Sequence, residues 1–292
     1  MLIAQLLNLL YNIVDRIYIG KIPGEGTLAL ASIGLCFPFV TLITAFANLF
    51  GLGGAPLCAM ARGKGNREGA QGIMVNAGFM LLLSGAVLTV LGIAFHRPLL
   101  YLFGASEVTY PYASSYIVIY LIGTLCVMLS LGLNPYINCQ GFARTGMLTV
   151  ALGAAANIVL DPIFIFALHL GVRGAAIATV LSQLLSAAWV VKFLTGKKAE
   201  LKLDFRGFRP DWHCIQPITV LGIASFVMSF TDTLVQVACN ATLRNFGGDL
   251  YISVMTVLNS VRQIAQTPVL AIADGASTAM SYNYGARLYR RT

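Results

Sequence analysis

The sequence predicts an all-α protein that crosses a membrane many times, and three observations support this fold class. Of the 292 residues, 58% are hydrophobic and only 10% are charged, and the mean hydropathy is +0.79, far from the balance of a soluble domain. The apolar residues form continuous runs of about 20 residues or more, the length that a spanning helix needs. These runs do not alternate as the short strands of a membrane barrel do, so helices are expected.

We expect eight spans along the chain. They cover approximately residues 1–19, 28–60, 73–95, 112–138, 147–168, 172–195, 214–239 and 250–280. Because the sequence opens directly into apolar residues and stops soon after the eighth span, we expect a piece of a longer protein with further helices.

Lysine and arginine are distributed unevenly over the connections. Together the connections after the second, fourth, sixth and eighth spans, with the span ends that border them, carry 13 of them, and the connections after the other spans carry 4. The positive-inside rule then predicts a multi-pass protein of the plasma membrane with a cytoplasmic N-terminus. The same distribution accounts for the net charge of +8 without nucleic-acid binding.

The longest polar stretch, TGKKAELKLDFRGFRPDW, marks a boundary in the chain. We expect a first six-helix lobe over 1–195, a cytoplasmic linker over 196–213, and the first two helices of a second lobe over 214–292. Asp15 in the first span and Asp232 in the seventh hold similar places in their spans. The sequence separation of these two acids is close to that of Gly65, after the second span, and Gly285, at the end of the eighth. Such a repeat is typical of transporters whose halves rock around a central site.

Acidic residues inside the spans need a physical reason, because a charged carboxylate near mid-membrane costs about 2.5 to 3.5 kcal/mol. The spans contain Asp15, Asp161, Asp232 and Asp274. Asp161 has no basic neighbour in its span. Asp15 precedes Arg16, so an interfacial ion pair with an arginine that extends outward is the structural alternative. Arg262 lies mid-span and is expected to face the interior and to pair with an acid that the sequence does not identify, and the role of Asp274 stays open.

The polar residues of three spans fall into two layers, as judged from a rise of about 1.5 Å per residue. The layer about 8 to 10 Å below the extracellular ends comprises Asp15, Asp161 and Thr179. The layer about 17 to 18 Å below them comprises Asn8, Asn157 and Gln183. Matched layers predict one polar cavity inside the first lobe, open toward the outside. The alternative for the amides and the threonine is hydrogen bonding between helices.

A desolvated carboxylate can take up a proton, or when ionised can bind Na⁺ or a cationic substrate. We therefore expect Asp15 and Asp161 to be the ion-coupling acids, with Na⁺ at this pair as the only metal considered. Pro162 breaks the fifth span beside Asp161 and is the expected hinge. No cofactor and no catalytic residue are expected, because the sequence contains neither H-E-x-x-H nor G-x-S-x-G.

Several segments are distinctive as a set. They are NIVDRIYIG and ALASIGL in the first two spans, NPYINCQGFARTG after the fourth, NIVLDPIFIF, GVRGAAIATVLSQ and the final SYNYGAR. Together they resemble the multidrug and toxic compound extrusion (MATE) transporters, in particular the MepA/DinF-like branch.

The resemblance implies twelve helices in two six-helix lobes related by a pseudo-twofold axis, eight of which lie in this sequence. It also implies a first-lobe site for ion and substrate at Asn8, Asp15, Asn134, Asn157, Asp161 and Thr179. Gln183 would line the same cavity, and Asp232 is a candidate for a site in the second lobe.

The sequence therefore predicts a monomeric multidrug efflux antiporter that exports cationic or amphipathic organic compounds in exchange for H⁺ or Na⁺. The alternative is a flippase of lipid-linked oligosaccharides from the same superfamily. A flippase would favour arginines that hold pyrophosphate, whereas the first-lobe spans contain acids and only two arginines, Arg16 and, at the start of the sixth span, Arg173.

Overall fold

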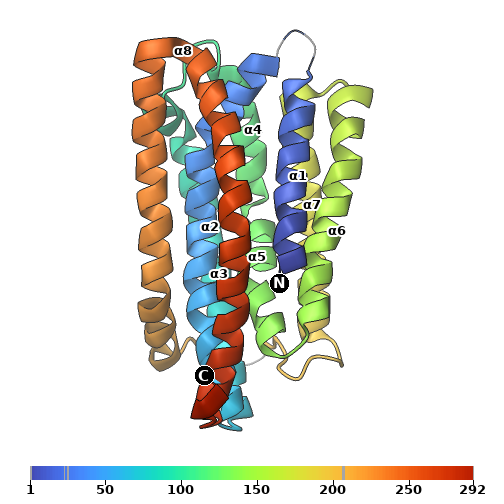
Figure 1. Cartoon of the computed structure of the whole chain (residues 1–292), viewed down its shortest axis with the longest axis vertical. Coiled ribbons are helices and arrows are strands. Elements are labelled where there is room, and N and C mark those ends of the chain that lie inside the picture. Colours follow the sequence, from blue (N-terminus) through green and yellow to red (C-terminus); the bar gives the residue numbers. More distant parts are fainter. Residues whose placement is uncertain (1, 23, 25, 206–207, 292) are drawn as a thin grey trace.

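The computed structural model describes residues 2–22, 24, 26–205 and 208–291, and every regular element within them is helical (Figure 1). Within the helices, the side chains at positions 2–5, 8, 9, 12, 244, 249, 260, 274 and 291 lie outside this description. The elements are α1 (Leu2–Gly20), α2 (Gly26–Gly63), α3 (Arg67–Leu102), α4 (Tyr110–Ile122), α5 (Thr124–Cys139), α6 (Ala143–Pro162), a π-helical turn (Ile163–Ala167), α7 (Gly171–Thr195), α8 (Trp212–Gly285) and a 3₁₀ turn (Tyr289–Arg291).

Five described helices are long and apolar enough to cross a membrane. They are α2, α3, α6 with its π-helical extension, α7 and the first part of α8, Trp212–Leu243. The bent pair of α4 and α5 is a sixth candidate. With α1 and the second part of α8, these segments match the eight predicted runs and confirm the all-α, multi-pass membrane fold.

Two of the predicted spans are not single regular helices. The span predicted over 112–138 is broken at Gly123, where α4 and α5 meet at a bend of 57°. A Cβ at Gly123 would lie 2.6 Å from Cγ2 of Val180, so the glycine lets α7 pack closely at the break. The span predicted over 147–168 ends its α-helical part at Pro162, which has no N–H for the next helical hydrogen bond, and continues as the π-helical turn.

The two spans predicted after the linker form the two legs of α8. Gly248 separates them, with φ 61° and ψ −157°, a conformation that glycine adopts much more readily than other residues. The chain reverses there, so the two legs run along the bundle in opposite directions (Figure 1). The first leg begins at the N-cap Asp211, whose Oδ1 accepts a hydrogen bond from the N–H of His213 at 2.9 Å.

Small residues allow α2 to pack directly against α8. A Cβ on Gly53 would collide with the backbone of Ile218 and Gly222, and a Cβ on Gly222 would collide with the carbonyl of Leu49. Near the other end of α2, Gly63 lies against the backbone of Gly285. Close backbone approach through small residues is how membrane helices gain van der Waals contact where water provides no hydrophobic drive.

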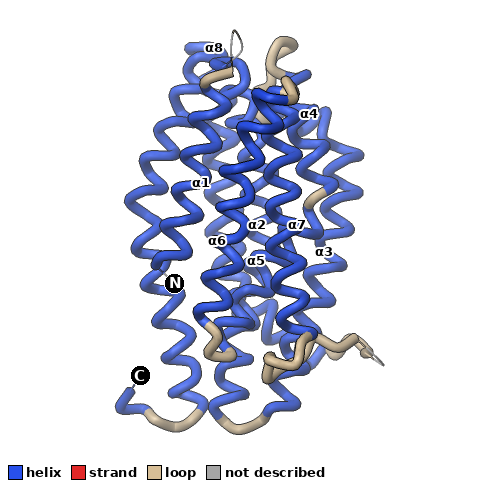
Figure 2. The backbone as a smooth tube through the Cα atoms, turned by 90° about the vertical axis from the view of Figure 1, so that its right-hand side faces the viewer, coloured by secondary structure: helices blue, strands red, loops and turns tan. Residues whose placement is uncertain are grey.

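The turns and loops gather at the two ends of the bundle, while the helices run along its length (Figure 2). We call one of these the linker end; it contains residues 64–66, 140–142 and the described residues of the segment between α7 and α8, 196–205 and 208–211. That segment is held in place by the ion pair of Arg62 with Glu200 and by the Leu201 N–H, which donates to Oε1 of Gln140 at 2.9 Å. The opposite end contains the connections after α1 and α3, and the break at Gly248.

Candidate ion-coupling site

The buried carboxyl group of the site comes from α6. Asp161 is 0% exposed and Asn157, one turn earlier on the same face, is 1% exposed. Nδ2 of Asn157 donates a hydrogen bond to Oδ1 of Asp161 at 3.1 Å. The amide and the acid therefore form a pre-oriented unit near the opposite end of α6.

The second carboxyl group comes from α1, which packs along α6. The side chain of Asp15 contacts the carboxyl group of Asp161. Tyr18, one turn further along α1, packs edge-to-face against Phe166 of the π-helical turn, with ring centroids 6.1 Å apart. The contact between two chain-distant acids thus rests on a packed helix pair.

The two acids leave oxygen atoms available for a ligand. Oδ1 of Asp15, Oδ2 of Asp161 and Oδ1 of Asn157 are buried, and none has a hydrogen-bond partner among the described residues. Two carboxylates in contact at low dielectric repel each other strongly unless a proton or a cation lies between them. The arrangement is therefore chemically suited to take up one positive charge.

The other predicted cavity residues are distributed over a wider region. Oε1 of Gln183 accepts a hydrogen bond from Oγ of Ser130 at 2.6 Å, which joins α7 to α5. Thr179 is partly buried on α7, and no described contact links it to the acids. Asn134 lies on α5 toward the linker end, with a buried Oδ1 that lacks a partner within the described part of the chain.

Four further residues considered in the sequence are either outside the description or away from the acid pair in the part of the chain that is described. The side chain of Asn8 lies outside the described residues, as does that of Asp274. Asp232 is exposed on α8. Arg262 is exposed as well, so the prediction that it faces the interior is wrong for this chain. Among the described contacts, neither Asp232 nor Arg262 touches Asp15 or Asp161.

The sequence-based alternative of an outward-extended Arg16 is wrong. Arg16 is 8% exposed, its guanidinium lies 4.6 Å from the ring centroid of Phe37, and Nη1 donates to the carbonyl of Thr256 at 3.4 Å. The arginine therefore joins α1 to α2 and α8 inside the bundle.

Sequence reasoning did not identify Asn138, which lies one turn after Asn134 on α5. Its Oδ1 is buried and also lacks a partner in the described chain. The four-residue spacing of the two asparagines within NPYINC was the available signal, because residues i and i+4 share a helix face.

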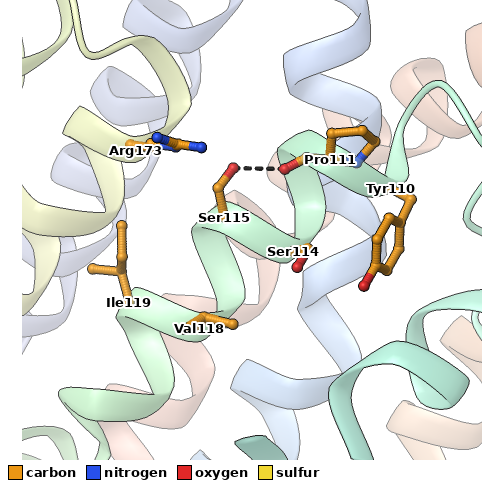
Figure 3. A pocket seen from close by; sticks show the side chains of 7 residues that line it. All are labelled: Tyr110, Pro111, Ser114, Ser115, Val118, Ile119 and Arg173. Atoms are coloured by element: carbon orange, nitrogen blue, oxygen red, sulfur yellow. Dashed lines mark hydrogen bonds between the residues drawn. The ribbon is translucent and has the colours of Figure 1, made fainter.

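A surface pocket of about 530 Å³ lies away from this site, between α4 and the start of α7. Figure 3 shows Arg173 reaching toward it, while Oγ of Ser115 donates to the carbonyl of Pro111 at 2.7 Å within α4. None of the predicted site residues lines this pocket.

Comparisons with known proteins bear on the family to which the chain belongs. The family model MatE matches residues 1–163. The multidrug export protein MepA of Staphylococcus haemolyticus strain JCSC1435 is 25% identical over 284 residues, covering 97% of this chain and 62% of that protein. MepA of Staphylococcus aureus strain NCTC 8325 is 22% identical over 286 residues, covering 98% of this chain and 63% of that protein.

Solved structures give the same result. The MATE multidrug transporter DinF-BH in complex with rhodamine 6G superimposes with a TM-score of 0.91 at 30% identity, covering 99% of this chain and 65% of that one. The chain therefore spans less than two thirds of the length of these relatives. The family model, the relatives and the fold agree: the chain belongs to the MatE family of membrane transporters, which is not a family of enzymes.

Proposed function

We propose that the transporter containing this chain is an antiporter that exports cationic or amphipathic organic compounds across the plasma membrane in exchange for H⁺ or Na⁺. In this proposal Asp15 and Asp161 carry the coupling cation, and Asn157 orients Asp161. Asn8, Asn134, Thr179 and Gln183 line the path of ion or substrate, and Asp232 contributes from the second lobe. The domain limits predicted from the sequence, 1–195, 196–213 and 214–292, belong to the same proposal, as do a cytoplasmic N-terminus and a monomeric state.

The observation that carries the proposal is the contact between two carboxyl groups from different helices, with three oxygen atoms unpartnered within the described chain. Binding of one cation relieves the repulsion between the acids, and its release restores it. Since α1 and α6 each supply one acid, cation binding changes the free energy of bringing these helices together. A site of this kind can link ion entry to a change in helix packing.

The buried position of Arg16 supports an antiporter over a flippase. A flippase for a lipid-linked pyrophosphate needs cationic side chains that face the substrate. Arg16 instead lies over Phe37 and donates to the carbonyl of Thr256. The buried charged groups of the site that are available to a ligand are acids. Such a site favours a cation over an anion.

The test is transport by the purified transporter in liposomes, with the proton and sodium gradients imposed and collapsed one at a time. The dye is rhodamine 6G. We expect Asp161→Asn and Asp15→Asn each to abolish gradient-driven dye accumulation, because an amide can neither release a proton nor neutralise Na⁺. Both variants should remain folded, since each replaces a buried acid by a neutral group of similar volume.

The matched control is Glu68→Gln, which makes the same chemical change at an exposed acid in the first turn of α3. This variant should transport like the parent. Retained gradient-driven accumulation in Asp161→Asn would sink the assignment, whichever gradient supports it.

A further inference from the structure

The buried face of α6 is unusual for a membrane helix. Its buried residues are Gly146, Thr149, Ala154, Asn157 and Asp161, so within this fully described helix every buried side chain is small or polar. Two of its large apolar residues point outward, Leu148 at 44% and Val159 at 58% exposure. The interior that α6 shares with α5 and α7 is therefore more polar than the surface that faces lipid.

This polar face is continuous along the helix. From Gly146 to Asp161 it extends about 22 Å, from the linker end to the acid pair. In the middle, Oγ of Ser186 on α7 donates to the carbonyl of Thr149 at 3.1 Å, and it sits where a side chain on Gly153 would be. A hydroxyl group thus occupies the centre of the path.

The linker-end part of this path contains acceptors without donors. Oδ1 of Asn138 lies where a Cβ on Gly146 would be, and Oδ1 of Asn134 lies 3.3 Å from the same point. Asn138 is 9% exposed, and neither oxygen has a hydrogen-bond partner among the described residues. Two amide oxygens therefore converge on Gly146, and that of Asn138 fills the space that a side chain at this position would need.

Buried acceptors without a protein partner are normally satisfied by ordered water, which binds where two or more polar groups converge. Here such acceptors occur at both ends of the path, at Asn157 and Asp161 and again at Asn134 and Asn138. We propose that ordered water connects these two groups of acceptors in one hydrated column. The column runs through the interior between α5, α6 and α7, from the acid pair to Gly146.

An aromatic pair lies at the linker end of the column. Phe142 precedes Gly146 by one helical turn, and its ring packs edge-to-face against Phe193 of α7, with centroids 5.1 Å apart. Phe193 is two turns beyond Ser186 and so lies on the same face of α7. These two rings close the column in this structure. Under the proposed function, which this role requires, their separation would give the acid pair an aqueous route to the linker side.

The test uses silver ion, a probe close in size to the common monovalent cations, which replaces the proton of a thiol group. Ag⁺ plus R–SH gives R–S–Ag and H⁺, a reaction that needs water to accept the proton. Thr149→Cys places a thiol in the column, and Leu148→Cys places one at the neighbouring exposed position. The fraction of each cysteine that resists later alkylation, measured by peptide mass spectrometry, reports silver binding without removal of the six native cysteines.

We expect the thiol at the buried position 149 to react at least 10-fold faster than the thiol at the exposed position 148, the reverse of the order of their exposures. Ser186→Cys, on the facing helix, should react like Thr149→Cys and guards against local misfolding of one variant. Phe193→Ala should accelerate the reaction at 149 severalfold.

Equal or slower reaction at both column positions than at 148 would overturn the column, and an unchanged rate in Phe193→Ala would overturn the aromatic closure. Silver binding requires no transport, so the two proposals fail separately. Fast reaction in a protein whose dye transport ignores both gradients would retain the column and reject the coupling role of the acids.

Discussion

Two buried polar clusters lie in the membrane part of this molecule, and they differ in how their hydrogen bonds are satisfied. The first joins α8 to itself and to α2. Nδ2 of Asn259 donates to Oε1 of Gln236 at 3.1 Å, Nε2 of Gln236 donates to Oδ1 of Asn240 at 3.3 Å, and Nδ2 of Asn240 donates to the carbonyl of Gly34 at 3.4 Å. This α8 amide network connects three segments through a chain of donors and acceptors.

The second cluster is the acid pair with Asn157, where one hydrogen bond within α6 leaves three buried oxygens unpartnered in the described chain. Polar groups of both clusters are buried, so burial alone does not identify a functional site. The two clusters differ in whether they retain hydrogen-bond acceptors that can bind a ligand. A network whose bonds are made holds helices together, whereas a network with free acceptors can receive a ligand.

The largest expected effect follows from Asn157→Leu, which removes the donor to Asp161 and one candidate ligand oxygen. A hydrogen bond to a charged group contributes about 1.5 to 3 kcal/mol, which corresponds to roughly a 10- to 100-fold change in ion affinity. The measurement is the concentration of the coupling cation that gives half-maximal dye transport in liposomes.

The direction of that change distinguishes the two cations. If Na⁺ is the coupling ion, loss of Oδ1 removes a ligand and half-maximal transport requires more sodium. If H⁺ is the coupling ion, loss of the donor removes a group that competes with the proton, and half-maximal transport requires less acid. A variant with the parent's ion dependence would contradict any role for Asn157 in coupling.

A different outcome is expected for Asn259→Leu in the α8 amide network. The substitution leaves Oε1 of Gln236 without its donor from α8, and an unsatisfied buried group costs about 1 to 3 kcal/mol. We expect a lower unfolding temperature of the detergent-solubilised transporter, with the half-saturating cation concentration unchanged. A shift in ion dependence without loss of stability would show that this network is more than a structural link.

The local features of the site could be predicted from the sequence because they depend on helix periodicity. The four-residue spacing of Asn157 and Asp161 is enough to place both on one face, and matching their depth to that of Asp15 brings α1 into consideration. The all-α membrane fold follows with equal directness from the length of the apolar runs.

Other features depend on contacts that the local sequence does not contain. The space beside Gly123 at the break is occupied by Val180, which lies far along the chain. Arg16 points inward, where it packs over the ring of Phe37 and donates a hydrogen bond to the carbonyl of Thr256. The pairing of Asn138 with Gly146 depends on how α5 and α6 turn around residues 140–142, and helix spacing alone does not fix that geometry.

The smallest expected effect is that of Pro162→Ala, which sharpens the comparison by acting on the backbone beside the acid pair rather than on its polar groups. Alanine restores an N–H that can donate to the carbonyl of Ile158, so it favours a regular α-helix over the π-helical turn that now follows Asp161. One hydrogen bond contributes about 0.5 to 1.5 kcal/mol, which shifts a two-state equilibrium roughly 2- to 10-fold.

If that turn is the hinge of the transport cycle, Pro162→Ala should slow gradient-driven rhodamine 6G transport by this factor while the half-saturating cation concentration stays the same, because the acids and Asn157 are untouched. The matched control is Pro98→Ala in α3, another proline within a described helix and outside the site. Transport at the parent rate in Pro162→Ala would remove the hinge from the mechanism and leave Asp161 as the functional residue of this stretch. A changed ion dependence would instead indicate that Pro162 positions the carboxyl group, and that the π-helical turn belongs to the binding site.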